Sequence, residues 1–185
     1  MKKIFTLAFI CVLLLASSTI CLADDTFKKG NNINIRGNGN QSVSVNFNSL
    51  GRNIIVAVQA NSNSGTVISM SLGGSKIFER SFSTYQNSIW AKTITDTSTG
   101  RGFFAITLGN RAYLFGYVPE KNAIATYVDS GNYHNGAAER PEFDITSNGE
   151  LYLIFHANHS SAKHVYRLTW DRSKNWFAYR DLGIH

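Results

Sequence analysis

The stretch that decides the fold is residues 102–118, GFFAITLGNRAYLFGYV. Two short apolar runs, 102–108 and 112–118, flank the pair Gly109-Asn110, whose residues tolerate the positive φ angles of a tight turn. Short apolar runs bounded by turn residues are typical of strands. The stretch therefore predicts two strands joined by a tight connection.

The same pattern continues along the chain in both directions. Beyond residue 23, no segment has a sustained helical stripe, whereas alternating or apolar runs recur between clusters of Gly, Asn and Ser. Turn residues also stand at 72–75 and 148–149. The other strands are expected at 43–47, 53–59, 66–72, 76–82, 88–95, 123–128, 142–146, 150–156, 164–170 and 176–181. The sequence thus predicts an all-β chain of short antiparallel strands.

The first residues have the layout of a secretory signal peptide. Lys2 and Lys3 precede an apolar run at 4–15, and cleavage is expected after Ala23. A membrane-spanning helix is a weaker alternative, because a bilayer requires roughly 20 apolar residues. A lipid anchor on Cys21 is a further alternative. We expect a signal peptide at residues 1–23 and a secreted, extracellular protein.

Removal of the signal peptide also removes both cysteines, so the remaining chain must fold without a disulfide. Residues 24–41, with their Gly-Asn alternation, are expected to form a flexible lead-in or a closing edge strand. Residues 42–185 are expected to form a single all-β domain. The formal net charge of +6 falls to +4 without Lys2 and Lys3. This mild basicity gives no reason to expect a nucleic-acid partner.

Internal similarity indicates a repeat. Residues 104–107 (FAIT) are echoed by residues 143–146 (FDIT), and residues 113–114 (YL) by residues 152–153 (YL), both at a spacing of 39. A fainter copy begins near residue 45. We infer about three four-stranded units, with about 20 additional residues around 85–101.

The last unit, residues 148–183, consists of a turn with Gly149, an apolar strand, a loop and two strands with one tryptophan each. It resembles a blade of the secreted β-propeller lectins and tectonin-like proteins, in which these features recur. The matching positions are Gly149, Leu151, Leu153, Phe155, Val165, Trp170, Trp176, Leu182 and Gly183. The resemblance implies a β-propeller-like fold, with a β-sandwich as the alternative. Since ordinary propellers have four to eight blades, either a fourth blade lies within 31–100 or several chains complete the ring.

The resemblance also implies a carbohydrate-binding, lectin-like function without catalysis. In such a blade one tryptophan packs between sheets and another faces a cleft, where a ring can stack on the apolar face of a sugar. The ligand-binding candidates are Trp170, Trp176, Tyr166, Arg167 and Tyr179, with Glu79, Arg80 and Tyr127 as counterparts in the other units. The expected partners are glycans or cell-surface glycoconjugates. The basic residues within 163–180 could also attract an anionic membrane surface.

Other functions have weaker support. The sequence has no nucleophile elbow, phosphate-binding loop or metalloprotease helix, so we expect neither an enzyme nor a cofactor. His156, His159 and His164 match no defined metal-ligand spacing, and we expect no metal. The first alternative is a membrane-active protein in which the Ser/Thr-rich segments 66–72 and 88–100 rearrange into a pore hairpin. A structural extracellular protein is the second, and a homo-oligomer is compatible with every function considered.

Overall fold

The computed structural model describes residues 27–36, 41–61, 63–83, 88–108, 111–130, 138–157 and 161–185. In these ranges the chain forms thirteen strands and a single helical element, the 3₁₀ turn η1 (Pro119–Lys121). The prediction of an all-β chain is confirmed. Across the same ranges, no helix is long and apolar enough to cross a membrane.

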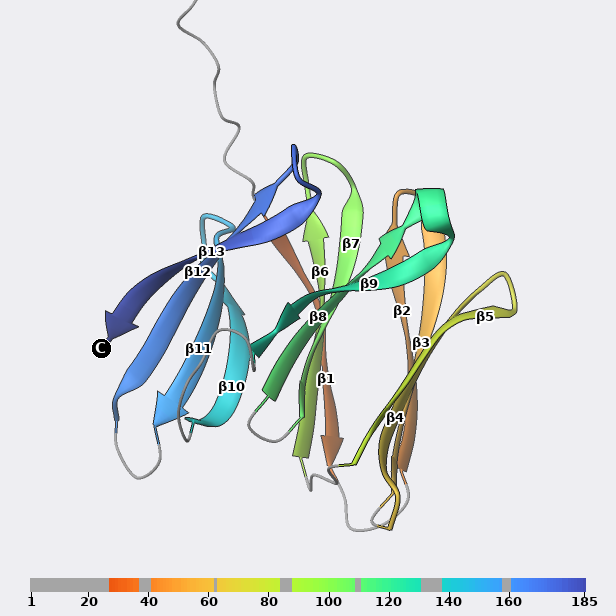
Figure 1. The fold of residues 1–185 in the computed structure, drawn as a ribbon, viewed down its shortest axis with the longest axis horizontal. Coiled ribbons are helices and arrows are strands. Elements are labelled where there is room, and N and C mark those ends of the chain that lie inside the picture. The colour runs from red at the N-terminus through yellow and green to blue at the C-terminus, as the bar shows by residue number, and fades with distance from the viewer. Residues whose placement is uncertain are drawn as a thin grey trace, which may run out of the picture.

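The strands form three antiparallel sheets, none of which closes on itself (Figure 1). The N-terminal sheet has the order β2 (Gln41–Ser49), β3 (Arg52–Asn61), β4 (Gly65–Leu72) and β5 (Ser75–Phe82). The central sheet has the order β1 (Phe27–Arg36), β6 (Ser88–Asp96), β7 (Arg101–Leu108), β8 (Arg111–Val118) and β9 (Ala123–Asp129). The C-terminal sheet has the order β10 (Ala138–Ile145), β11 (Leu151–Ala157), β12 (Lys163–Asp171) and β13 (Trp176–Ile184).

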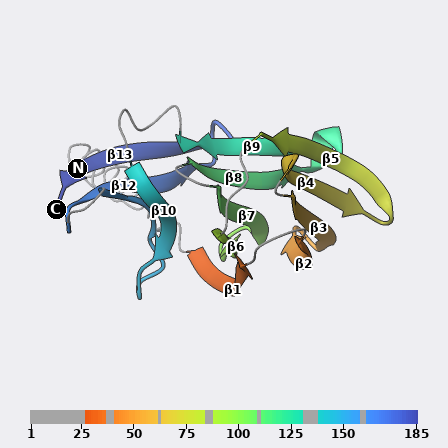
Figure 2. The ribbon, with the colours of Figure 1, turned by 90° about the horizontal axis from the view of Figure 1, so that it is seen from below.

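The central sheet lies between the other two, as Figures 1 and 2 show from two directions. Successive side chains of a strand point to opposite faces of its sheet. On β7, Phe103 and Ala105 therefore belong to the core shared with the C-terminal sheet. Phe104 and Ile106 belong to the core shared with the N-terminal sheet. A strand covered on both faces has a continuous apolar run instead of an alternating one, as residues 102–108 do.

Polar contacts also join the sheets. Gly102 on β7 donates its backbone N–H to Ser49 Oγ on β2, at 3.1 Å. A Cβ atom at Gly102 would lie 1.9 Å from the carbonyl oxygen of Asn48, so the approach of β2 requires glycine there. On the other face, Lys92 Nζ donates to the carbonyl oxygen of Phe143, 3.0 Å away on β10.

The predicted strands agree closely with the observed ones. Ten of the twelve lie wholly within an observed strand, and the other two, 142–146 and 150–156, overlap β10 and β11. The segment 24–41 contains β1, which pairs with β6 at the edge of the central sheet. At the predicted turns, Gly73, Gly74 and Gly149 have φ angles of 58°, 85° and 84°. The predicted turn at Gly109-Asn110 lies outside the described residues.

The similar sequence segments lie on corresponding strands. Residues 104–107 and 143–146 fall on β7 and at the end of β10, which are adjacent to β8 and β11 in their sheets. Residues 113–114 and 152–153 fall on β8 and β11. The additional residues around 85–101 include all of β6, which pairs with β7 on one side and β1 on the other.

Two hairpin turns are built in the same way around an aspartate. Asp96 Oδ1 accepts hydrogen bonds from the backbone N–H and the hydroxyl of Ser98, at 3.0 and 2.6 Å. Asp171 Oδ1 accepts the equivalent bonds from Ser173, at 3.0 and 2.6 Å. The β6–β7 turn is thus an ordinary turn closed by its own side chains. Asp96 also accepts from the hydroxyl of Thr99 and is fully buried, whereas Asp171 is partly exposed.

We predict that Asp96→Ala destabilises the fold by about 1–3 kcal/mol, because it removes a buried carboxylate that accepts hydrogen bonds from Ser98 and Thr99. Asp171→Ala is the matched control, and its loss should be smaller because water can replace the carboxylate in the exposed turn. Equilibrium unfolding in urea gives the free energy of unfolding of each variant. Equal losses in the two variants would contradict the structural difference between the turns.

Candidate functional site

The candidate site is built on the β12–β13 hairpin. Trp170 pairs with Phe177 across the hairpin, and Asp171 pairs with Trp176. Asn175, which ends the turn, has a φ angle of 50°, a conformation that asparagine tolerates better than most residues. The turn places Trp176 at the first position of β13, the last strand of the C-terminal sheet.

Trp170 lies in a buried aromatic cluster between the central and C-terminal sheets. Its side chain is only 4% exposed, and its ring contacts those of Tyr127, Phe103 and Phe177 at centroid distances of 5.0, 5.3 and 4.9 Å. Gly116 on β8 makes room for the cluster, because a Cβ atom there would lie 2.6 Å from the Tyr127 ring and 2.8 Å from the Phe103 ring. Trp170 is therefore part of the core.

Two rings of the same sheet are half exposed instead. Trp176 is 45% exposed and Tyr179 is 50% exposed. Trp176 rests against the buried ring of Tyr127, with 5.8 Å between centroids and 64° between planes. Tyr179 rests against the buried ring of Tyr166, at 5.9 Å and 68°. Each exposed ring is thus held edge-to-face by a buried tyrosine, which limits its freedom before any ligand arrives.

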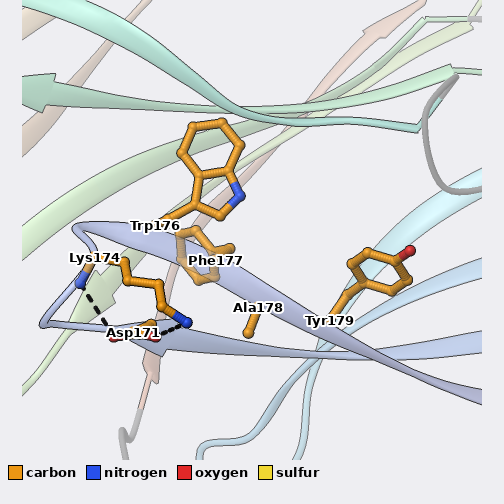
Figure 3. A pocket seen from close by; sticks show the side chains of 6 residues that line it. All are labelled: Asp171, Lys174, Trp176, Phe177, Ala178 and Tyr179. Carbon is orange, nitrogen blue, oxygen red and sulfur yellow. Dashed lines mark hydrogen bonds and ion pairs between the residues drawn. The ribbon is translucent and has the colours of Figure 1, made fainter.

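An open pocket of about 340 Å³ lies along this part of β13 (Figure 3). Phe177 and Ala178 lie between the two exposed rings in sequence and contribute to the lining. Asp171 and Lys174 line the end of the pocket near the turn. The pocket therefore combines an aromatic surface with one acidic and one basic side chain.

The charged groups of the turn are ordered by hydrogen bonds. Asp171 Oδ1 accepts from the backbone N–H of Lys174 at 3.2 Å, and Lys174 Nζ lies 3.3 Å from Asp171 Oδ2. The hydrogen bond from Ser173 is the largest cause that holds the pKa of Asp171 below its ordinary value, and Lys174 adds to the effect. Burial raises the pKa of the Tyr127 hydroxyl, with the positive charge of Arg101 opposing that shift. Burial also raises the pKa of Tyr166.

Arg101, on β7, links the central sheet to the β12–β13 hairpin of the C-terminal sheet. Its guanidinium lies 5.3 Å from the centroid of the Trp170 ring, within the range of a cation–π contact. Arg101 Nη1 donates to Asn175 Oδ1 at 2.7 Å and to the Tyr127 hydroxyl at 3.4 Å. Arg172 donates to Ser98 Oγ, which connects the β12–β13 turn to the β6–β7 turn. These contacts fix the hairpin that carries the pocket.

The structure brings five of the eight candidate residues into this region: Trp170, Trp176, Tyr166, Tyr179 and Tyr127. Only Trp176 and Tyr179 line the pocket, while the other three are buried behind it. Arg167 is not among the lining residues and pairs with Glu150 at 2.5 Å.

The remaining two candidates lie on β5, in the N-terminal sheet. Glu79 pairs with Lys76 at 2.7 Å. Arg80 lies 5.0 Å from the ring centroids of both Phe82 and Tyr113, and 3.5 Å from Asp129 Oδ2 on β9. These contacts place Arg80 at the junction with the central sheet, where it bridges the two sheets.

The sequence interpretation missed Arg101 and did not assign Asp171, Lys174, Phe177 or Ala178 to the site. The last four lie within the aromatic stretch, so proximity in sequence could have suggested them. Arg101 gives no local signal, because its partners on β9, on β12 and in the β12–β13 turn are far away in the chain. Among the described residues, no group of His, Cys, Asp and Glu could hold a metal ion. His159 lies outside those residues.

We predict that Ser173→Ala raises the pKa of Asp171 toward the ordinary value of about 4, since the variant removes the main donor to its carboxylate. Because folding lowers the pKa of Asp171, its ionised carboxylate stabilises the folded hairpin at pH values above its ordinary pKa. This contribution is lost as the pH falls through the folded pKa. NMR titration of the carboxyl carbon measures the shift. The control is Thr169→Ala, at an exposed position of β12, which should leave the pKa of Asp171 unchanged. An unchanged Asp171 titration in Ser173→Ala would contradict the assigned cause of the pKa shift.

Comparison of the chain with protein-family models, with curated proteins and with solved structures found no match. The geometry of the site is therefore the basis for a function.

Proposed function

We propose that this protein is a secreted carbohydrate-binding module, lectin-like and without catalysis, whose site is the pocket along β13. The observation that carries the proposal is the pair of half-exposed rings, Trp176 and Tyr179, that line one open pocket and are each held by a buried tyrosine. Flat exposed rings suit the apolar C–H face of a sugar, and ordered rings lose little freedom on binding.

The polar groups of the pocket suit the hydroxyl groups of a sugar. The Asp171 carboxylate accepts hydrogen bonds and the Lys174 ammonium donates them, so together they can bind neighbouring hydroxyls. Lys174 has an exposed side chain, and it can turn from Asp171 toward a ligand at little cost. A few placed polar groups beside an apolar lining are the usual composition of a small-ligand site.

We further propose that the three sheets are consecutive blades of a propeller-like assembly. Two features support this: the N-terminal and C-terminal sheets are four-stranded meanders, and the sheets stack face to face. In that architecture a second copy of the chain could supply further blades. Several sites on one rigid assembly would raise the avidity for a glycan-coated surface by a factor of about 10² or more.

The structure gives less support to the membrane-active alternative. Its two candidate segments correspond to β4 and to β6 with its turn. Ile68 and Met70 on β4, and Ile89 and Ile94 on β6, are fully buried. Each segment pairs with a strand on both sides. Conversion to a pore would expose these side chains and break both sheets, whereas glycan binding at β13 needs no rearrangement.

We predict that Trp176→Ala weakens glycan binding by about tenfold or more, equivalent to about 1.4 kcal/mol, because it removes one of the two stacking surfaces. The measurement is binding of residues 24–185 to a broad glycan array, followed by titration calorimetry with the best glycan.

The matched control is Trp90→Ala, which removes a tryptophan that is 48% exposed on β6 and is not in the pocket. Its affinity should equal that of the wild type. Equal losses in the two variants would contradict the site, and no binding to any glycan by a folded wild-type protein would contradict the function.

A further inference from the structure

We propose that Arg80 is the centre of an anion-binding site at the junction of the N-terminal and central sheets, and that its ligand is a sulfate, phosphate or carboxylate group. This site shares no residue with the pocket on β13, and the inference does not depend on the proposed function. Three features carry it: the support of the Arg80 guanidinium, its hydrogen-bond donors, and a second arginine beside the same carboxylate.

Two buried rings from different sheets support the Arg80 guanidinium. Arg80 and Phe82 lie on β5, next to the edge strand β9 of the central sheet (Figure 2). Arg80 Cζ lies 5.0 Å from the ring centroids of both Phe82 and Tyr113, and both rings are buried. A guanidinium that lies over a ring keeps the N–H groups at its edge for hydrogen bonds in its own plane. A ligand therefore meets an arginine that is already oriented.

The fold makes little use of the donors of Arg80. Its closest approach to Asp129, between Nη2 and Oδ2, is 3.5 Å, whereas a strong charged hydrogen bond measures about 2.7–2.9 Å. Among the described residues, its partners are this carboxylate and the two rings. Arg101 at the other junction also lies over a ring, but it donates to Asn175 Oδ1 at 2.7 Å. Because the side chain of Arg80 is 36% exposed, its donors are accessible to a ligand.

A second arginine adds positive charge to this junction. Arg111 lies two residues before Tyr113 and therefore projects from the same face of β8. The hydrogen bond between these two side chains is the largest cause that raises the pKa of Arg111 above its ordinary value, and Asp129 acts in the same direction. In the described part of the chain, Arg80 and Arg111 thus share one carboxylate. The excess positive charge favours an anionic ligand.

The class of ligand follows from the chemistry of the guanidinium. Its planar set of N–H groups matches two oxygens of a carboxylate, sulfate or phosphate group. Glu79 is next to Arg80 in the sequence, but its side chain points to the other face of β5 and pairs with Lys76 at 2.7 Å. It therefore does not occupy the donors of Arg80. An oxyanion is the favoured ligand, either free or as a group on a larger molecule.

The test is a titration of the protein with sodium sulfate, sodium phosphate and sodium acetate, with sodium chloride keeping the ionic strength constant. NMR follows the Nε–H signal of Arg80 and the backbone amide signals of β5 and β9. We expect a saturable shift of these signals with at least one of the three oxyanions. No saturable shift with any of them would overturn the inference.

The variants separate anion binding from a purely structural ion pair, with the backbone amide signals as the readout. Arg80→Gln should weaken the anion affinity by about tenfold or more, and Arg111→Gln should weaken it less, because it removes charge but not the oriented donors. Asp129→Asn should raise the affinity, because it removes the carboxylate that repels the anion. Arg52→Gln, at an exposed position of β3, is the control and should match the wild type. An unchanged affinity in Arg80→Gln or a lower one in Asp129→Asn would overturn the inference.

A sulfated sugar identifies the source of the oxyanion. Glucose 6-sulfate and glucose are titrated in the same way as inorganic sulfate. Tighter binding of glucose 6-sulfate than of inorganic sulfate would assign a group on a larger ligand, and equal affinities would assign a free anion; both results support the site. Equal shifts of the same signals with glucose and glucose 6-sulfate would overturn it. Failure of the protein to bind any glycan on the array would contradict the proposed function but not this inference.

Discussion

The structure depends on the burial of the central sheet on both faces. Phe103 and Phe104 are neighbours on β7, and each is fully buried in a different core. Because adjacent strand residues point to opposite faces, this one pair ties the C-terminal sheet to one side and the N-terminal sheet to the other. The three sheets are therefore joined by hydrophobic packing, with Arg80, Arg101 and Lys92 adding polar links where the layers meet.

The candidate site follows from the same packing. The Phe103 ring contacts Tyr127, Trp170 and Phe177 at centroid distances of 5.7, 5.3 and 5.1 Å. Tyr127 in turn supports Trp176 at the edge of the C-terminal sheet. Trp176 thus lies on β13 of the C-terminal sheet, whereas the tyrosine that supports it lies on β9 of the central sheet. This dependence explains how the described residues, which include no cysteine, hold an open aromatic surface in a defined position.

Most of the fold could be predicted from the sequence, because strand alternation and turn glycines are local signals. The aromatic stretch likewise indicated the region of the site. The sequence could not show which rings are exposed, since Trp170 and Trp176 are both large rings of one hairpin. That difference arises from the stacking of the central sheet over Trp170 and from the edge position of Trp176. Arg101 and its partners meet only in the folded chain, which is why no sequence pattern indicated their contact.

The most direct test is equilibrium unfolding of the wild type and of Phe103→Ala in guanidinium chloride, followed by both far-UV circular dichroism and tryptophan fluorescence. Trp90 lies in the central sheet, and Trp170 and Trp176 lie in the C-terminal sheet, so the fluorescence reports on both sheets. We predict coincident single transitions and a loss of about 3–5 kcal/mol in the free energy of unfolding of the variant, the usual cost of removing a buried phenylalanine ring. Separate transitions for the two probes in the wild type, or a loss below about 1 kcal/mol, would contradict a common core built on the central sheet.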